Sequence, residues 1–292
     1  MPLFSSLNIR SKIIAAMLAA AALTGLTQAW LGNDNVQDGY SSSLQTRLSA
    51  IAEITAGRVE GYFANARAIA TSLGEDLMVA EALGEFTNSI GISVMSSPPK
   101  MVERMKEYYA DNYVSRLVTN DGSTPLVDAL VPDSVPARFL QFHYVVANKA
   151  AIGKKSELDM ANDGSPYSAA HARFHPPLRA IRENFGFEDV FLINPRGVVV
   201  YSTIKEIDFM TDLTDGPFSD SGLAKAFSAA KLERANRPVV MVDYSFYQPS
   251  YGAPSFFIAT PVFIGRQFKG VIAVQLSAVQ INAVVNNKQE IG

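Results

Sequence analysis

The sequence predicts an α+β protein in which a membrane-anchoring helix and a long stalk helix lead into a helical layer and an antiparallel sheet of five strands. Three observations predict this architecture. An uncharged stretch near the N-terminus is long enough to cross a bilayer. The segment after it has apolar residues at helical spacing, and the last part of the chain changes to short apolar runs joined by tight turns.

Composition excludes several classes of protein. The chain has 292 residues, of which 48% are hydrophobic and 18% charged, a balance that supports a packed core and argues against disorder. The formal net charge is -3, so a basic excess is missing and we expect no nucleic-acid partner. The chain has no cysteine, which excludes disulfides and thiolate metal sites. We expect no cofactor.

Residues 13–33 are the expected transmembrane anchor, because they carry no charge and number roughly 21, enough to cross about 30 Å of hydrocarbon. Arg10 and Lys12 precede this stretch, and Asp34 and Asp38 follow it. That charge asymmetry predicts a cytoplasmic N-terminus at residues 1–12 and an extracytoplasmic, periplasmic remainder held by the inner (cytoplasmic) membrane.

Two other interpretations of the same stretch stay open. Thr27, Gln28 and Ala29 resemble the small-x-small end of a cleaved signal peptide. The stretch could also be a buried helix of a globular domain, although it lacks an amphipathic stripe. The anchor and the signal peptide both place the chain beyond Asn33 outside the cytoplasm.

Residues 34–135 are expected to form a helical stalk followed by a helical layer. The stalk's apolar stripe has near-heptad spacing, which is typical of a helix packed on a second subunit, and we expect a homodimer through it. An amphipathic helix of a monomer fits the same stripe. The Gly, Ser and Pro residues at 84–99 predict a helix break. The stripe consists of Leu44, Leu48, Ile51, Thr55, Tyr62, Ala66, Ile69 and Leu73.

Residues 136–286 are expected to form the main domain, and 287–292 a tail or the start of a further segment. A helix opens at Ser165 and Pro166, is kinked or divided at Pro176 and Pro177, and stops at Gly186. Short apolar runs then predict strands, with a helix at 222–231 between the second and third. The strands are expected at 189–194, 198–203, 238–246, 256–264 and 268–276.

Short connections make this sheet antiparallel, and we expect the helices to cover one of its faces. The order of elements is that of a PAS-like domain. Four stretches resemble the Cache family of extracytoplasmic sensors, found in methyl-accepting chemotaxis receptors, sensor kinases and membrane-bound cyclases. They are FLQFHY at 139–144 with Asn148, DGSPY at 163–167 with His171, His175 and Pro176, FGFED at 185–189 with Phe191 and Leu192, and YS at 201–202 with Lys205, Glu206, Asp208 and Phe209.

The resemblance covers about half the chain and implies an extracytoplasmic small-molecule sensor of a transmembrane signal-transduction receptor of the chemotaxis, cyclase or kinase type. Ligand binding would rearrange the helices. Such receptors continue into a second sensory unit or a return membrane helix and an output module, whereas this sequence stops at Gly292. That departure puts signalling by this chain alone in doubt.

A ligand cavity needs apolar walls and a few directed polar groups. Tyrosine supplies both, and Lys, Arg and Asp select the charge of the ligand. Each candidate could equally be ordinary core packing or a solvated surface residue. The candidate ligand-binding residues are Arg173, His171, Tyr201, Lys205, Asp208, Tyr244 and Phe246.

Catalytic machinery is not expected. His171 and His175 are four apart on a helix, the spacing of two metal ligands on one face, but the Glu of the zinc-hydrolase signature is missing between them. Two alternative functions stay open. A metal-dependent exported enzyme requires His171 and His175 to converge with Asp163 or Asp189, and a ligand-free membrane-anchored adaptor requires an exposed apolar stripe on the stalk.

Overall fold

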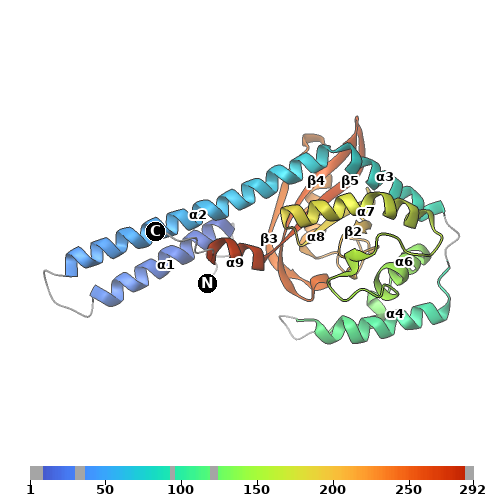
Figure 1. Ribbon diagram of the computed structural model, residues 1–292, viewed down its shortest axis with the longest axis horizontal. Helices are drawn as coiled ribbons and strands as arrows, with labels where there is room; N and C mark the ends of the chain where they lie inside the picture. Colours follow the sequence, from blue (N-terminus) through green and yellow to red (C-terminus); the bar gives the residue numbers. More distant parts are fainter. Residues whose placement is uncertain (1–8, 30–36, 93–95, 119–123, 287–292) are drawn as a thin grey trace. The chain divides into compact units, whose positions relative to one another are not determined.

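The structure, a computed structural model, describes residues 9–29, 37–92, 96–118 and 124–286 (Figure 1). It consists of two compact units. One contains residues 1–65 and 279–292, and the other contains residues 66–278. All site residues discussed below belong to the second unit.

The first unit contains α1 (Ile9–Ala29), the first part of α2 (Gln37–Glu75) and most of α9 (Ala278–Asn286). Within it, the Tyr62 hydroxyl donates a hydrogen bond of 2.9 Å to Gln280 Oε1. The prediction of an anchor at 13–33 is not supported, because no helix in the described part of the chain is long and apolar enough to cross a membrane.

The stalk stripe lies on α2. Among the stripe residues whose side chains the structure describes, Thr55, Ala66 and Leu73 are buried, whereas Leu48 and Ile51 are exposed; the side chain of Leu44 lies outside the described part. The structure has one helix break that was not predicted, because α2 ends at Glu75 and Asp76 Oδ1 accepts from the Val79 N–H to open α3 (Leu77–Ile92). The break predicted at 84–99 lies between the end of α3 at Ile92 and the start of the next helix at Pro99, although α3 continues through position 84.

Several short helices and turns follow along the chain, and the longer helix α7 comes last. Ser134 and Ser165 each accept a backbone N–H to cap α6 and α7. Pro176 and Pro177 lie inside α7 without dividing it, and Gly186 ends it at a φ of 67°. The elements are α4 (Pro99–Asn112), η1 (Val114–Arg116), α5 (Val127–Leu130), α6 (Val135–Gln141), the π-helical turn η2 (Phe142–Val146), η3 (Lys155–Glu157) and α7 (Pro166–Phe185).

The second unit is built on a five-stranded antiparallel sheet in the order β2-β1-β5-β4-β3. The α+β class and the five predicted strands are confirmed. The strands are β1 (Asp189–Ile193), β2 (Val199–Ser202), β3 (Val240–Tyr247), β4 (Ala253–Ile264) and β5 (Gln267–Ser277), with α8 (Gly222–Leu232), η4 (Arg234–Asn236) and η5 (Gln248–Ser250) in the connections.

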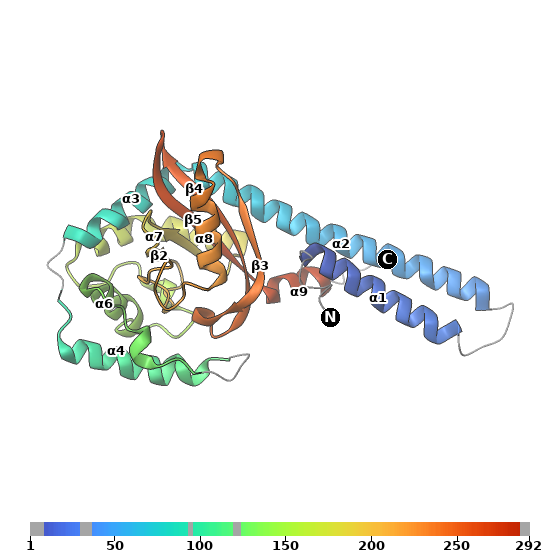
Figure 2. The ribbon, with the colours of Figure 1, turned by 180° about the vertical axis from the view of Figure 1, so that it is seen from behind.

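Helices cover both faces of this sheet, and the expectation of one covered face is wrong (Figure 2). α8 packs across β3, β4 and β5, while α3 packs on β2, β4 and β5 and also against α7. Side chains alternate between the faces, so Phe191, Ala273 and Phe257 join the apolar cluster beneath α8. Burial on both faces explains why β1 and β2 read as continuous apolar runs.

Candidate functional site

The α8 face of the sheet turns polar at one end. Asp189 begins β1 and stands directly opposite Gln275 of β5, which in turn stands opposite Phe257 of β4. Alternation puts Asp189 and Gln275 on the same face as Phe191 and Ala273. Both polar side chains are fully buried, at 0% and 1% exposure. Tyr247, the last residue of β3, is buried in the same cluster.

A segment with unusual backbone geometry covers this polar end. It follows β2, and two of its residues, Lys205 and Met210, have φ angles of 57° and 66°, a region that side chains other than glycine rarely adopt. Neighbouring bonds hold it in place. The Met210 N–H donates to the Val199 carbonyl, and Gln141 Nε2 donates to the carbonyls of Ile207 and Phe209. Backbone strain held in this way is typical of functional sites.

Asp189 anchors the start of that segment. Its Oδ1 accepts backbone N–H bonds from Val190, Thr203 and Ile204 at 2.7, 2.7 and 3.2 Å. Its Oδ2 accepts from the Ser202 hydroxyl at 2.6 Å. Burial raises the pKa of Asp189 to about 6, and the bonds from Ser202 and Val190 oppose that rise. One buried carboxylate therefore ties β1 to the chain that leaves β2.

Lys205 is a buried cation without a carboxylate partner. Its ammonium donates to the Ser202 carbonyl and lies 4.1 Å from the centroid of the Tyr201 ring, with the rings of Phe209 and Tyr144 at 5.2 and 5.7 Å. No carboxylate oxygen of a described residue lies within 4.0 Å of it. Burial lowers the pKa of Lys205 to about 7, although Asp189 and Asp208 act in the opposite direction.

Two further carboxylates lie close by. Asp208 Oδ2 accepts a 2.5 Å bond from the Tyr247 hydroxyl, while its Oδ1 is buried without a hydrogen-bond partner. Glu206 Oε2 accepts from the Ser250 hydroxyl at 2.7 Å. Burial raises the pKa of Asp208 to about 7, and burial and the charge of Asp208 raise that of Glu206.

A small enclosed cavity adjoins this cluster. Its volume is about 20 Å³, roughly the room of one water molecule. Aromatic rings and ionisable groups line this cavity. They come from α4, from the Lys205 segment and from the turn after β3. The residues that matter here are Tyr108, Tyr113, Tyr251, Lys155, Lys205 and Glu206.

His171 and His175 stack on each other at 4.3 Å, behind Tyr201. His175 Nε2 lies 2.7 Å from the Ser156 carbonyl, which can only accept, so Nε2 carries the proton and Nδ1 accepts from the Tyr201 hydroxyl at 2.7 Å. By the same argument His171 Nδ1 donates to the Asp159 carbonyl, and its buried Nε2 is an unpartnered acceptor. Burial lowers the pKa of His175 to about 3, and the Lys205 charge acts the same way.

A pH prediction follows for His175. Its pKa is about 3 in the folded chain and 6.5 ordinarily, so its neutral form contributes stability above pH 6.5 that is lost as the pH falls toward 3. We expect the difference in unfolding free energy between the wild type and His175→Gln to narrow by about 2 kcal/mol from pH 7 to pH 5. Urea titrations at both pH values measure it, and the subtraction removes the opposite trend of Asp189, Glu206 and Asp208. Parallel pH curves for the two proteins contradict the assignment.

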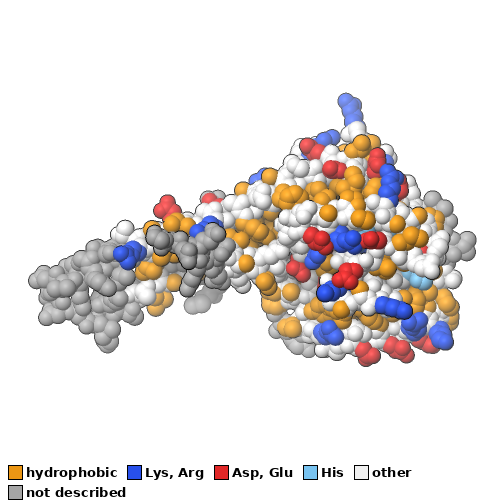
Figure 3. Space-filling view, in the orientation of Figure 1, with side chains coloured by type: hydrophobic (Ala, Val, Ile, Leu, Met, Phe, Trp, Pro, Cys, Tyr) orange, Lys and Arg blue, Asp and Glu red, His pale blue; other side chains and the backbone are white. Residues whose placement is uncertain are grey.

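The sequence-predicted residues divide into two groups. The structure brings His171, Tyr201, Lys205 and Asp208 into one buried region. Arg173 lies on the surface and pairs with Glu81 and Glu85 at 3.3 and 2.7 Å, where opposite charges alternate over α3 and α7 (Figure 3). On β3, Phe246 is 49% exposed and the Tyr244 hydroxyl donates to the Ser277 carbonyl. Arg173, Phe246 and Tyr244 therefore lie outside the cluster around Lys205.

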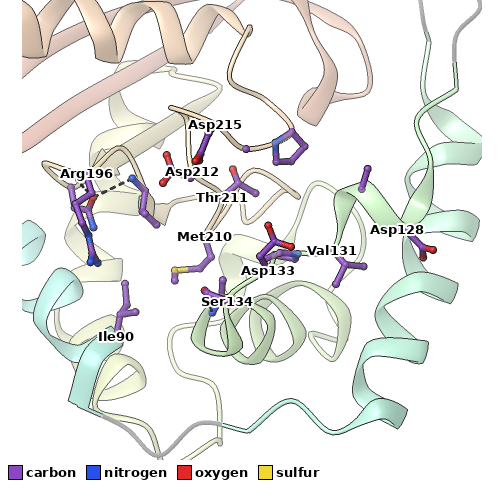
Figure 4. Close-up of a pocket in the computed structure, with 17 residues that line it drawn as sticks. Ile90, Asp128, Val131, Asp133, Ser134, Arg196, Met210, Thr211, Asp212 and Asp215 are labelled. Atoms are coloured by element: carbon purple, nitrogen blue, oxygen red, sulfur yellow. Dashed lines mark hydrogen bonds between the residues drawn. The ribbon is translucent and has the colours of Figure 1, made fainter.

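A larger cleft of about 620 Å³ opens on the other side of the Lys205 segment (Figure 4). Met210 and Thr211 contribute to it, and the carboxylates of Asp133, Asp212 and Asp215 surround its opening. Asp212 Oδ1 already accepts two bonds from Thr214, at 2.8 and 2.6 Å. The cleft has the size of a ligand site, but none of its lining residues has a buried polar atom without a hydrogen-bond partner.

The geometry does not assemble the set that a metal-dependent enzyme requires. Both ring nitrogens of His175 are engaged, with Tyr201 and Ser156. Among the described residues, no three His, Asp or Glu side chains are placed to share a metal ion.

Sequence reasoning missed part of the cluster, namely Tyr247, Gln275 and the cavity tyrosines. Gln275 had a visible signal, because it is a polar residue inside an apolar strand. Asp189 carries the same signal at the start of its strand. A buried polar residue in such a run must be hydrogen-bonded, which marks it as part of a network. Tyr108 and Tyr113 could not be recognised from the sequence, because aromatic residues on one face of a helix are usually part of the hydrophobic core.

No protein-family model and no curated protein matches the chain. Among solved structures, the sensor domain of the histidine kinase DctB from V. cholerae is similar at 18% sequence identity and a TM-score of 0.32. The match covers 41% of this chain and 43% of that one, less than half of either. A similarity of this size leaves the function to be argued from the chain itself.

Proposed function

We propose that this chain is a small-molecule sensing domain whose ligand binds in the interior around Lys205, between the polar end of the sheet and α4. The proposal gives the chain no catalytic role. It is the function expected from the resemblance to extracytoplasmic sensors, and the residues of the second unit support it independently.

One observation carries the proposal. Lys205, Glu206 and Asp208 lie together in the interior on a strained segment, and the Asp208 carboxylate keeps one buried oxygen without a hydrogen-bond partner. Burying charges that are not directly paired costs stability, and apolar residues of similar size commonly fold better. Groups of this kind, with shifted pKa values and beside a cavity, are typical of ligand sites.

The small cavity is the reason to propose sensing rather than static binding. A ligand larger than water has to move the wall formed by Tyr108 of α4 and Tyr113 just after it, or the turn that carries Tyr251. Binding would then shift the population between two arrangements of these elements. Gln275 lies three residues before α9 begins, so a displaced end of β5 offers a route by which the change reaches a helix.

The test is a thermal-shift screen of the full chain against amino acids, organic acids, amines and sugars. A ligand of the folded state should raise stability by about 2.7 kcal/mol at one hundred times its Kd, or about 5 to 10 °C in Tm. Tyr108→Ala, in the cavity wall, should weaken the response at least about tenfold. Phe246→Ala is the matched control on exposed β3 and should respond like the wild type.

Two outcomes count against the proposal. A folded chain that responds to nothing in the panel removes the sensing function. A response that Phe246→Ala abolishes and Tyr108→Ala leaves intact places the ligand elsewhere.

Location and assembly belong to the same proposal and rest on the sequence pattern. We propose an extracytoplasmic domain of a chemotaxis, cyclase or kinase receptor, held at the inner membrane, which protease accessibility in intact spheroplasts tests. We also propose a homodimer through α2, where Leu48, Ile51 and Ile54 are 41 to 51% exposed, and light scattering of the chain and of Ile51→Glu tests it. The same exposed residues support the second candidate function, a ligand-free adaptor.

A further inference from the structure

Most of the buried polar atoms that lack a hydrogen-bond partner are acceptors. In the described residues they are Asp163 Oδ2, His171 Nε2, Asp208 Oδ1, Gln275 Oε1 and Ser245 Oγ. A hydroxyl can donate or accept, but the other four are acceptors once their orientation is fixed. Two of these acceptors, Asp208 Oδ1 and Gln275 Oε1, lie behind the cavity wall, where Ser250 connects Gln275 to the cavity residue Glu206. The interior therefore has unused acceptors and lacks donors.

The orientation of the Gln275 amide follows from its neighbours. Its Nε2 lies 3.0 Å from Ser250 Oγ and 2.8 Å from Ser255 Oγ. Ser250 gives its proton to Glu206 Oε2 and Ser255 gives its proton to the Ala253 carbonyl, so both hydroxyls accept from Gln275. Rotating the amide would place its oxygen against two acceptors. Oε1 is therefore the unpartnered atom.

The two acceptors are parts of one hydrogen-bonded network around η5. Tyr247, just before this turn, donates to Asp208, and Ser250, its last residue, links Gln275 to Glu206. Asp208 and Gln275 are 0% and 1% exposed, so bulk water does not satisfy them.

The charge of the site points the same way. Three carboxylates, of Asp189, Glu206 and Asp208, lie near two ammonium groups, of Lys205 and Lys155. The Lys205 ammonium is engaged with the Ser202 carbonyl and aromatic rings, and the Lys155 ammonium donates to the Asn148 carbonyl at 3.0 Å. Both ammonium groups are therefore already engaged, and neither supplies a donor to Asp208 Oδ1 or Gln275 Oε1.

We propose that the ligand is a small organic cation with a primary ammonium group, whose N–H donors bond to Asp208 Oδ1 and Gln275 Oε1. This inference rests on the proposed sensing function and names the chemical class of its ligand. An ammonium supplies three donors, which the site lacks, and its positive charge is attracted by the Asp208 carboxylate. Hydrogen bonds between charged groups are also the stronger ones, so recognition favours an amine over an alcohol of the same shape.

The experiment compares matched pairs of compounds by calorimetry and thermal shift on the full chain. Each pair differs in an amine against a hydroxyl: ethanolamine and ethylene glycol, 1,4-diaminobutane and 1,4-butanediol, L-alanine and L-lactate. We expect the amine of at least one pair to bind about 10- to 100-fold more tightly than its hydroxyl partner. Binding of the hydroxyl members as tightly as the amines, or of dicarboxylates alone, overturns the inference while leaving the sensing function in place.

Two variants locate the recognition. Asp208→Asn removes the negative charge and keeps an oxygen for Tyr247, so amine affinity should fall at least about tenfold. Asp215→Asn makes the same change in the larger cleft and should leave affinity unaltered. The reverse pattern places the cation in the cleft and overturns the inference. If Asp208→Asn does not fold, the ranking of the matched pairs on the wild type decides alone, and a wild type that binds no compound of any class rejects the sensing function itself.

Discussion

Replacing Asp189 by alanine should destabilise the domain by about 3 to 5 kcal/mol, because it removes the acceptor of four hydrogen bonds at once. The Ile204 N–H and the Ser202 hydroxyl would then be buried without a partner, and the Thr203 N–H would keep only its bond to the Val190 carbonyl. Ser202 also accepts from the Lys205 N–H, so the loss extends to the strained segment. Urea unfolding of the full chain, monitored by far-UV circular dichroism, measures the effect.

Two control variants separate this network from a general effect of losing a carboxylate. Asp189→Asn keeps one acceptor oxygen and should lose about 1 to 2 kcal/mol. Asp212→Ala removes a partly exposed carboxylate that also accepts two bonds, and should cost within about 1 kcal/mol because water replaces it. Equal losses for Asp189→Ala and Asp212→Ala mean that Asp189 does not organise the segment.

Replacing Gly270 by alanine should be at least as damaging, with a loss of about 4 kcal/mol or more or failure to fold. A Cβ at this position would lie 2.1 Å from the Ile193 carbonyl oxygen of the neighbouring strand, and the φ of 141° is strained for any side chain. Relief requires β1 and β5 to separate in the centre of the sheet. Yield of folded protein and the midpoint of thermal unfolding measure the effect.

Two other glycines give the expected contrast. Gly265 has a φ of 60° with nothing within 4 Å of its added Cβ, so Gly265→Ala should cost only about 1 kcal/mol. Gly84 lies inside α3 with open space around it, and Gly84→Ala should stabilise by about 0.5 to 1 kcal/mol. If Gly270→Ala costs no more than Gly265→Ala, the close approach of the two strands is not real.

Most of the second unit could be predicted from sequence because its signals are local. Period-two and apolar runs between turn residues located all five strands, and the cap at Ser165 and the stop at Gly186 located α7. The predicted break at 84–99 contains the end of α3 but starts too early at Gly84, since a glycine inside a helix lowers helix stability without ending it. The N-terminal anchor was the least secure, because a stretch rich in alanine lies near the limit of insertion.

The candidate site was only half predictable. The sequence predicted four residues of the buried region from their residue types, namely His171, Tyr201, Lys205 and Asp208. Arg173 has an equally suitable side chain, but its position on α7 points it to Glu81 and Glu85, which only the packing of α3 on α7 reveals. Contacts between distant segments, such as Gln275 with Ser250, depend on sheet register and follow from the fold alone.

The edge of the sheet has a consequence for the behaviour of this protein in concentrated solution. β3 is the last strand in the order, it pairs with β4 alone among the described strands, and Met241 and Phe246 are exposed along it. Such an edge is a template onto which a strand of another molecule can add, the first step toward fibres. The irregular register between Val242 and Ser245 interrupts the straight row of backbone groups, and a charged Asp243 lies within it. The bulge therefore disfavours pairing of β3 with a strand of another molecule, whether or not a ligand is bound.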